Sequence, residues 1–213
     1  MTTTKTVTVT VWDPLVRIGH WALVIAFFTA YFTEDDLITQ HVWAGYTVAG
    51  IILIRLVWGF VGGRYAKFRN FIYKPSAILM YLKNLVARKP QHYIGHNPAG
   101  GAMVIALLFC LSITTLSGMK LYEVEENKGP FSITVQVAIK QAMASSPEMK
   151  NQQHTVNEED EEFWEEIHET FVNLTLLLVF LHIGGIIMSS IVDKEKLVKA
   201  MFTGKKEIND DFK

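Results

Sequence analysis

The chain has 213 residues, half of them apolar and 19% charged, and its formal net charge is -1. This length suits one domain of ordinary size, and a charge so close to neutral gives no reason to expect a nucleic-acid partner. The single cysteine, Cys110, excludes an intramolecular disulfide, a Cys-x-x-Cys-His attachment motif and an iron–sulfur cluster held by this chain alone.

The apolar residues are gathered into four long stretches, at about residues 15–33, 41–61, 100–119 and 168–192. A helix of roughly 20 mostly apolar residues crosses a hydrocarbon core of about 30 Å. Each stretch carries large apolar residues around its whole circumference, whereas a surface helix of a soluble protein has one apolar stripe. The sequence therefore predicts an all-α integral membrane four-helix bundle, with one domain over residues 1–206 and a polar tail at 207–213.

The first predicted helix has clear start signals. Trp12 suits a membrane interface, Asp13 suits the N-cap, and Pro14 suits the first helical position. Residues 1–10 lack the basic head and apolar run of a cleaved signal peptide, so this helix is expected to act as the insertion signal. The short acidic loop at 33–36 makes the second helix return antiparallel beside it.

The later connections differ in charge. The segment after the second span is basic, and Pro75 begins a short predicted helix to about Ala87, expected to lie in the membrane interface. The loop predicted at 122–166 is acidic, and its Gln152–Glu162 stretch is either disordered or a helical extension of the fourth span. The C-terminal tail is again basic. Because basic residues mark the cytoplasmic side, both termini are predicted to be cytoplasmic.

Four histidines lie in or at the ends of the predicted spans, where ionisable residues are costly and usually functional. His168 and His182 are fourteen residues apart, so they point in similar directions from one helix and lie about 21 Å apart along its axis. His20 is expected at the inner level of His182, and His41 at the outer level of His168. The spacing therefore predicts two pairs, His20–His182 and His41–His168, one in each leaflet.

Facing histidines on different helices of a bundle suit the two axial positions of a haem iron. A zinc site is the main competitor, but it needs three or four ligands that converge on one point. A single interfacial histidine is equally well explained as a polar anchor. Two pairs at matching depths favour axial ligands over both alternatives.

Three further residues are candidates for binding the cofactor. Arg55 is fourteen residues after His41 and should share its inward face, where a haem propionate would neutralise the guanidinium. Arg17, one turn before His20, is a second partner for a propionate, although either arginine could instead reach lipid phosphates. His96 could hydrogen-bond a propionate or a quinone, or it could only help to start the third helix.

Several motifs occur together between Val11 and Val192. In combination they resemble the bacterial cytochrome b561 and nickel–iron hydrogenase b-type cytochrome family. The motifs are Val11-Trp12-Asp13-Pro14 with Arg17 and His20-Trp21, His41 with Gly45, the Arg55–Gly59 run, the Gly95–Gly100 run, His168-Glu169, and His182–Gly185.

The resemblance implies a multi-pass di-haem cytochrome b in a bacterial inner membrane, with two haem b groups bound by His20, His41, His168 and His182. It also implies electron exchange between the membrane quinone pool and a periplasmic redox partner, such as a hydrogenase, another reductase or a cytochrome c. The 122–166 loop is longer and more acidic than in compact members, and it could dock a basic partner. Protonatable groups for quinone chemistry are His96 and Arg55 on the inner side, and Glu34, Asp35 and Glu169 on the outer side.

Two other functions are alternatives to electron transfer between these partners. A stand-alone quinone reductase using a small donor such as superoxide would need a positively charged outer funnel, whereas the outer loops here are acidic. A haem-free transporter or membrane anchor would use the histidines as a proton relay, which does not require pairs at matching depth.

Overall fold

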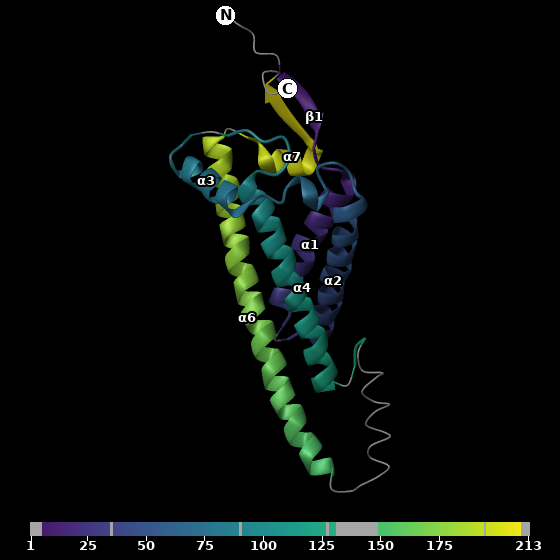
Figure 1. Cartoon of the computed structure of the whole chain (residues 1–213). Coiled ribbons are helices and arrows are strands. Elements are labelled where there is room, and N and C mark those ends of the chain that lie inside the picture. The colour runs from purple at the N-terminus through teal and green to yellow at the C-terminus, as the bar shows by residue number, and fades with distance from the viewer. Residues whose placement is uncertain are drawn as a thin grey trace, which may run out of the picture. The chain divides into compact units, whose positions relative to one another are not determined.

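The computed structural model describes residues 6–34, 36–89, 91–126, 128–130, 149–193 and 195–209. The fold is mostly helical (Figure 1). Its elements are β1 (Thr6–Thr10), α1 (Pro14–Phe32), α2 (Ile38–Val61), the 3-10 helix η1 (Phe68–Asn70), α3 (Pro75–Val86), α4 (Pro98–Glu126), α6 (Met149–Val192), α7 (Leu197–Thr203) and β2 (Lys205–Asn209).

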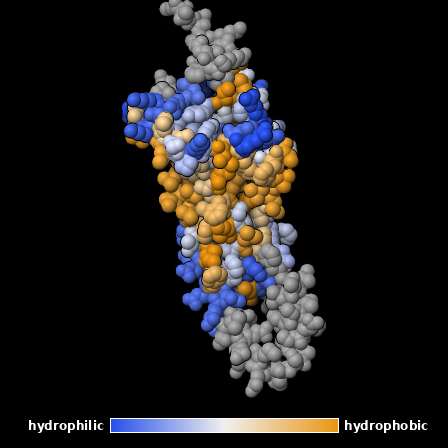
Figure 2. Space-filling view, in the orientation of Figure 1, coloured by the Kyte–Doolittle hydropathy of each residue, from blue (hydrophilic) through white to orange (hydrophobic). Residues whose placement is uncertain are grey.

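Within the described residues, four helices are long and apolar enough to cross a membrane: α1, α2, α4 and the Glu158–Val192 part of α6. Many of their large apolar side chains face outward, and Figure 2 shows hydrophobic residues over these helices and a mixture with hydrophilic residues around α3. Such extensive exposed apolar surface is expected where lipid, and not water, is the solvent. The four predicted spans are thereby confirmed.

The start of α1 is fixed by Asp13. Its Oδ1 accepts the backbone N–H of Val16 at 3.0 Å, with Pro14 in the first turn, as the sequence predicts. Its Oδ2 accepts the indole N–H of Trp58 at 2.9 Å. Trp58 belongs to α2, and α1 packs along α2. The Asp13 carboxylate therefore both caps α1 and joins it to α2.

The contacts divide the chain into two compact units. The first contains residues 1–108 and 177–213, and the second contains residues 109–176. The first unit therefore holds α1, α2, α3, α7 and the sheet, together with one part each of α4 and α6. The remaining parts of α4 and α6 form the second unit.

The ends of the described chain pair with each other. β1 and β2 are antiparallel, with register from Thr6↔Asn209 to Thr10↔Lys205 (Figure 1). Residues 207–209 of the predicted polar tail belong to this strand, while residues 210–213 lie outside the described residues. The Thr-Val alternation of residues 6–10 is the period-two signal of a strand, but it does not indicate which segment that strand pairs with.

Gly204 makes the turn between α7 and β2. Its φ is +77°, and a Cβ there would lie 2.7 Å from the carbonyl oxygen of Trp12. Its own carbonyl accepts the backbone N–H groups of Val11 at 2.8 Å and of Trp12 at 3.2 Å. Glycine is required because it tolerates positive φ and close backbone approach, and this turn joins the C-terminal segment to the start of α1.

The third and fourth helices are longer than predicted. α4 continues to Glu126 instead of ending near 119, and α6 begins at Met149 instead of 168. The predicted 122–166 loop is therefore too long, and Gln152–Glu162 is the helical extension and not the disordered alternative. Hydropathy marks where the apolar core ends, but glutamate and lysine are good helix formers, so both helices continue past that limit.

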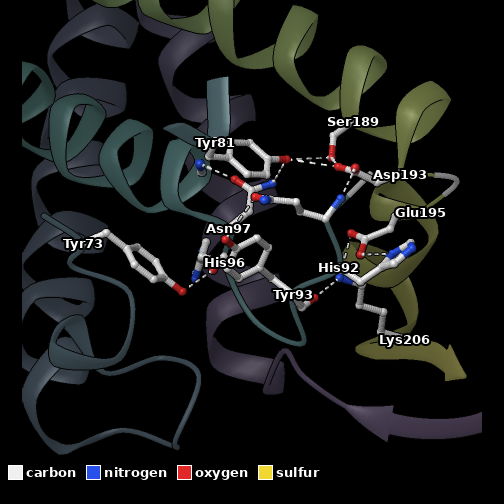
Figure 3. Close-up of polar contacts among 12 residues, drawn as sticks. Tyr73, Tyr81, His92, Tyr93, His96, Asn97, Ser189, Asp193, Glu195 and Lys206 are labelled. Carbon is white, nitrogen blue, oxygen red and sulfur yellow. Dashed lines mark hydrogen bonds and ion pairs between the residues drawn. The ribbon is translucent and has the colours of Figure 1, made fainter. Parts of the chain in front are cut away.

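A buried polar network fixes α3 in the first unit (Figure 3). The Tyr81 hydroxyl donates to Asp193 Oδ2 at 3.1 Å and accepts from the Asn97 amide at 2.8 Å. Ser189 donates to the same Asp193 oxygen at 2.7 Å. Burial, the largest cause, raises the pKa of Tyr81 to about 12, so this hydroxyl keeps its proton and remains a donor.

An ion pair adds the C-terminal strand to this layer. Lys206 Nζ lies 2.7 Å from Glu195, and both side chains are almost completely buried. Lys206 also donates to the carbonyl oxygen of Tyr93, and His92 lies 3.6 Å from Glu195 (Figure 3). The loop before α4, the end of α6 and β2 are therefore held together by charged contacts that are sheltered from water.

Candidate functional site

His20 on α1 and His182 on α6 face each other within the first unit. Their ring centres are 6.5 Å apart and their planes are inclined by 54°. An imidazole nitrogen binds a metal such as zinc at about 2.0–2.1 Å, so this separation leaves room for one metal atom between the rings. The structure thus brings together the two histidines that the spacing predicts as the inner pair.

The unit that contains this pair also contains buried nitrogens without hydrogen-bond partners. Among the described residues, six buried side-chain atoms lack a hydrogen-bond partner, and five of them are nitrogens of the first unit. Buried polar atoms are normally satisfied, so each exception points to a missing group. The five are Arg17 Nε, His20 Nδ1, Trp21 Nε1, Arg55 Nη1 and His96 Nδ1. Arginine nitrogens among them fit the carboxylates of an anionic cofactor.

Arg55 is held over two aromatic rings. Its guanidinium carbon lies 5.0 Å from the centre of the Phe68 ring and 5.9 Å from that of Phe71. A Cβ at Gly59 would collide with the Phe68 ring, so glycine at that position gives Phe68 its place. Within the described residues Arg55 forms no ion pair, and its buried Nη1 remains a donor for an anion.

His96 is packed between two aromatic side chains. The ring centres of Trp12 and Phe71 both lie 4.4 Å from that of His96. Burial first, and then the positive charge of Arg55, lower the pKa of His96 to about 3. The imidazole is therefore neutral near pH 7, with one nitrogen able to donate and the other to accept.

The start of α4 does not depend on the His96 side chain. Asn97 Oδ1 accepts the backbone N–H of Gly100 at 2.7 Å, which is the usual capping contact. The His96 carbonyl accepts the Tyr73 hydroxyl at 3.1 Å (Figure 3). Asn97, and not His96, therefore caps α4. The His96 ring stays available for another contact.

Arg17 is used in part by the fold. Its Nη1 donates to the carbonyl oxygen of Phe202 in α7, while its Nε is buried without a partner. The Trp21 ring stacks on Phe202, with centres 4.5 Å apart and planes inclined by 20°. α7 therefore covers the part of α1 next to His20. The basic composition of the C-terminal segment does not indicate this contact.

The other two histidines, His41 and His168, each have Nδ1 bonded to a backbone carbonyl. His41 Nδ1 lies 2.9 Å from the carbonyl oxygen of Ala30 in the first unit, and His168 Nδ1 lies 2.9 Å from that of Thr114 in the second. Because a carbonyl only accepts, Nδ1 carries the proton in both rings. The neutral tautomer then has its lone pair on Nε2, as a metal-ligating histidine requires.

Two residues of α4 shape the surroundings of His168 and were missed from the sequence. A Cβ at Gly118 would lie 2.7 Å from His168 Cε1, so only glycine leaves space for the ring. The almost fully buried Ser117 places its hydroxyl oxygen 3.3 Å from His168 Nδ1. A glycine inside an apolar span is the one signal that suggests close packing there.

The described residues contain no group of three or more His, Cys, Asp or Glu side chains suited to a metal ion, so the histidines are arranged as pairs or singly. A family model for the prokaryotic cytochrome b561 family matches residues 11–204. The chain belongs to this family. It is therefore a multi-pass inner-membrane protein that transfers electrons through b-type haem, which confirms the predicted family, membrane and cofactor class.

Curated relatives agree with this assignment. A probable Ni/Fe-hydrogenase B-type cytochrome subunit of Bradyrhizobium diazoefficiens is 24% identical over 95% of this chain and 87% of its own length. A protein with the same description from Rhizobium leguminosarum bv. viciae is 21% identical over 94% of this chain and 89% of its own length. No solved structure matches the chain significantly.

Proposed function

We propose that this cytochrome b561 family member transfers electrons across the membrane with two b haems, one bound by His20 and His182 and the other by His41 and His168. A b haem supplies one-electron oxidation and reduction when it is bound. The observation that carries the proposal is the facing of the His20 and His182 rings, 6.5 Å apart, in a unit with five buried nitrogens without partners, one of them His20 Nδ1.

At the inner site, the chain's own residues hold and shield the cofactor. His20 and His182 would hold the haem iron between them, and a haem held by two histidines supplies electron transfer and not oxygen binding. Arg55 and His96 would offer their buried, unpartnered nitrogens to the haem carboxylates, and Arg17 would offer its Nε. Trp21 and Phe202 stack beside His20 and keep water away from it.

At the outer site, support comes from orientation and spacing. Both His41 and His168 have Nδ1 hydrogen-bonded to a backbone carbonyl, which leaves Nε2 as the ligating nitrogen. Gly118 leaves space for the His168 ring. The fourteen-residue spacing of His168 and His182 turns both toward one side of α6 at different depths, which favours two haems over one.

The direction of the path is also part of the proposal. Basic residues between α2 and α4 and after α6 favour a cytoplasmic location for that end and for both termini. The pairing of β1 with β2 supports termini on the same side. The descriptions of the two relatives as hydrogenase cytochrome subunits favour a periplasmic redox enzyme as one partner.

The membrane quinone pool is proposed as the other partner. A quinone needs a hydrogen-bond partner near the cofactor, and the neutral His96 imidazole can supply one at the inner end. Glu34 and Glu169 are exposed candidates at the outer end, while Asp35 lies outside the described residues.

Electron transfer across a sealed membrane tests the proposal. Protein in liposomes is given a membrane-impermeant reductant outside and ferricyanide inside, and the decay of ferricyanide is followed optically. Wild-type protein should reduce the trapped ferricyanide, whereas His41→Ala should fall to the rate of protein-free liposomes while it still binds the inner haem. His92→Ala, a substitution in the loop outside the spans, is the matched control and should keep the wild-type rate. A His41→Ala rate equal to that of the wild type would refute the transmembrane path.

A further inference from the structure

α3 leaves an apolar stripe uncovered. Leu79, Leu82 and Val86 are 67%, 42% and 75% exposed. Their spacing of three and four residues places them on one side of the helix. On the adjoining side Tyr81 and Leu85 are only 2% and 9% exposed. The helix is therefore attached to the protein by one side, and a second apolar side remains without a partner in the described residues.

This stripe cannot turn inward without breaking buried contacts. Tyr81 is fixed by its hydrogen bonds to Asp193 and Asn97, with Ser189 bonded to the same carboxylate (Figure 3). The rotation that would bury Leu82 would withdraw the Tyr81 hydroxyl from these partners. Buried polar groups are expensive to leave unsatisfied, so the orientation of the stripe is a fixed property of the fold.

The segment around α3 carries charge of one sign. The sequence has no acidic residue between Asp36 and Glu123, whereas seven basic residues lie between Gly62 and Asn97. Within the described residues, six of the seven form no ion pair or cation–π contact. The seventh is Arg64, whose guanidinium carbon lies 5.9 Å from the centre of the Tyr65 ring. The seven are Arg64, Lys67, Arg69, Lys74, Lys83, Arg88 and Lys89. A segment with this excess of positive charge favours contact with an anionic surface.

The position of α3 in the chain identifies that surface. The segment begins where the α2 span ends at Val61 and closes where the α4 span begins at Pro98, so both of its ends are at the limit of the membrane. Figure 2 shows hydrophilic residues mixed with hydrophobic ones around α3, beside the hydrophobic spanning helices. A helix with an apolar stripe flanked by basic residues at this level fits the headgroup layer of a bilayer.

We propose that α3 binds anionic phospholipids of the adjacent leaflet. Leu79, Leu82 and Val86 insert between the upper parts of the acyl chains, and Lys83 and Arg88 bind the phosphate groups. Lys83 is next to Leu82 in sequence and one turn from Leu79, so its ammonium group reaches the headgroup level from the edge of the stripe. This surface is separate from the haem-binding residues and does not depend on how many haems the protein carries.

The experiment places an environment-sensitive fluorophore on Leu82→Cys in full-length, haem-loaded protein, reconstituted in nanodiscs. Cys110 is buried, so labelled wild-type protein reports any background. Discs contain phosphatidylcholine alone or mixed with phosphatidylglycerol, with brominated acyl chains as quenchers. The matched control is Asn84→Cys, a partly exposed position of the same helix on the side away from the stripe. An unchanged haem spectrum verifies folding of each labelled protein.

We expect the Leu82→Cys label to emit at shorter wavelength and to be quenched by brominated chains, more strongly with phosphatidylglycerol, while the Asn84→Cys label responds to neither lipid. Adding K83Q and R88Q should remove the phosphatidylglycerol dependence. Equal emission of the two labels in both kinds of disc would overturn the proposal, as would a phosphatidylglycerol effect that survives K83Q and R88Q. A shift that appears only in discs with two copies would assign the stripe to a second copy of the chain instead.

Discussion

His182→Ala should lower the haem content of the purified protein from two b haems per chain to one. The variant removes one of two rings that lie 6.5 Å apart, and we expect the inner haem to be lost during purification when only one of its two histidines remains. Haem is counted as the pyridine haemochrome per mole of protein, and the reduced-minus-oxidised spectrum shows whether the remaining haem is still bis-histidine ligated.

Combined variants determine which histidines share a haem. His20→Ala should have the same phenotype as His182→Ala, and the double variant should lose no more, because both residues act on one site. His41→Ala with His182→Ala should lose both haems. His92→Ala is the control, since it removes an imidazole whose partner is Glu195 and should keep both. A folded His20→Ala, His182→Ala double variant without any haem would contradict the assignment of pairs.

Gly118→Ala should weaken or abolish binding of the other haem. The added Cβ would lie 2.7 Å from Cε1 and 3.0 Å from Nδ1 of His168. The ring cannot retreat freely, because its Nδ1 is bonded to the Thr114 carbonyl at 2.9 Å. Overpacking of this kind costs about 1–3 kcal/mol, so we expect the ring to leave its place. The measurement is the haem content together with a redox titration.

The control for this substitution is Gly50→Ala, which adds the same methyl group to a spanning helix where nothing lies within 4 Å of the new Cβ. It should keep both haems and both potentials. Gly118→Ala should change only the haem that His41→Ala also removes. If Gly118→Ala has the haem content and both potentials of the wild type, then His168 is not an axial ligand in the orientation described.

Local patterns in the sequence predicted much of the fold and half of the geometry of the site. The Asp13–Pro14 start of α1, the short helix from Pro75 and the four spans all follow from capping, proline placement and hydropathy. The fourteen-residue spacing in α6 and the position of His20 predicted the facing of His20 and His182, which the structure shows. The pairing of His41 with His168 stays a prediction.

The remaining features depend on contacts between distant parts of the chain. Arg17 bonds to the carbonyl of Phe202 across 185 positions of sequence, and no local pattern indicates that α7 covers α1. The roles of Ser117 and Gly118 beside His168 likewise require the relative rotation of two helices. Hydropathy does not predict the ends of α4 and α6, because charged residues can continue a helix beyond the membrane.

The haem content of wild-type protein, purified in detergent and titrated with a reductant, is the most direct test of the central claim. We predict two b haems per chain, reduced in two steps, both with the spectrum of bis-histidine ligation. One haem per chain would leave an electron-transfer protein without a path from one side of the membrane to the other. That result, or a second haem with a different axial ligand, would contradict the assignment of the four histidines.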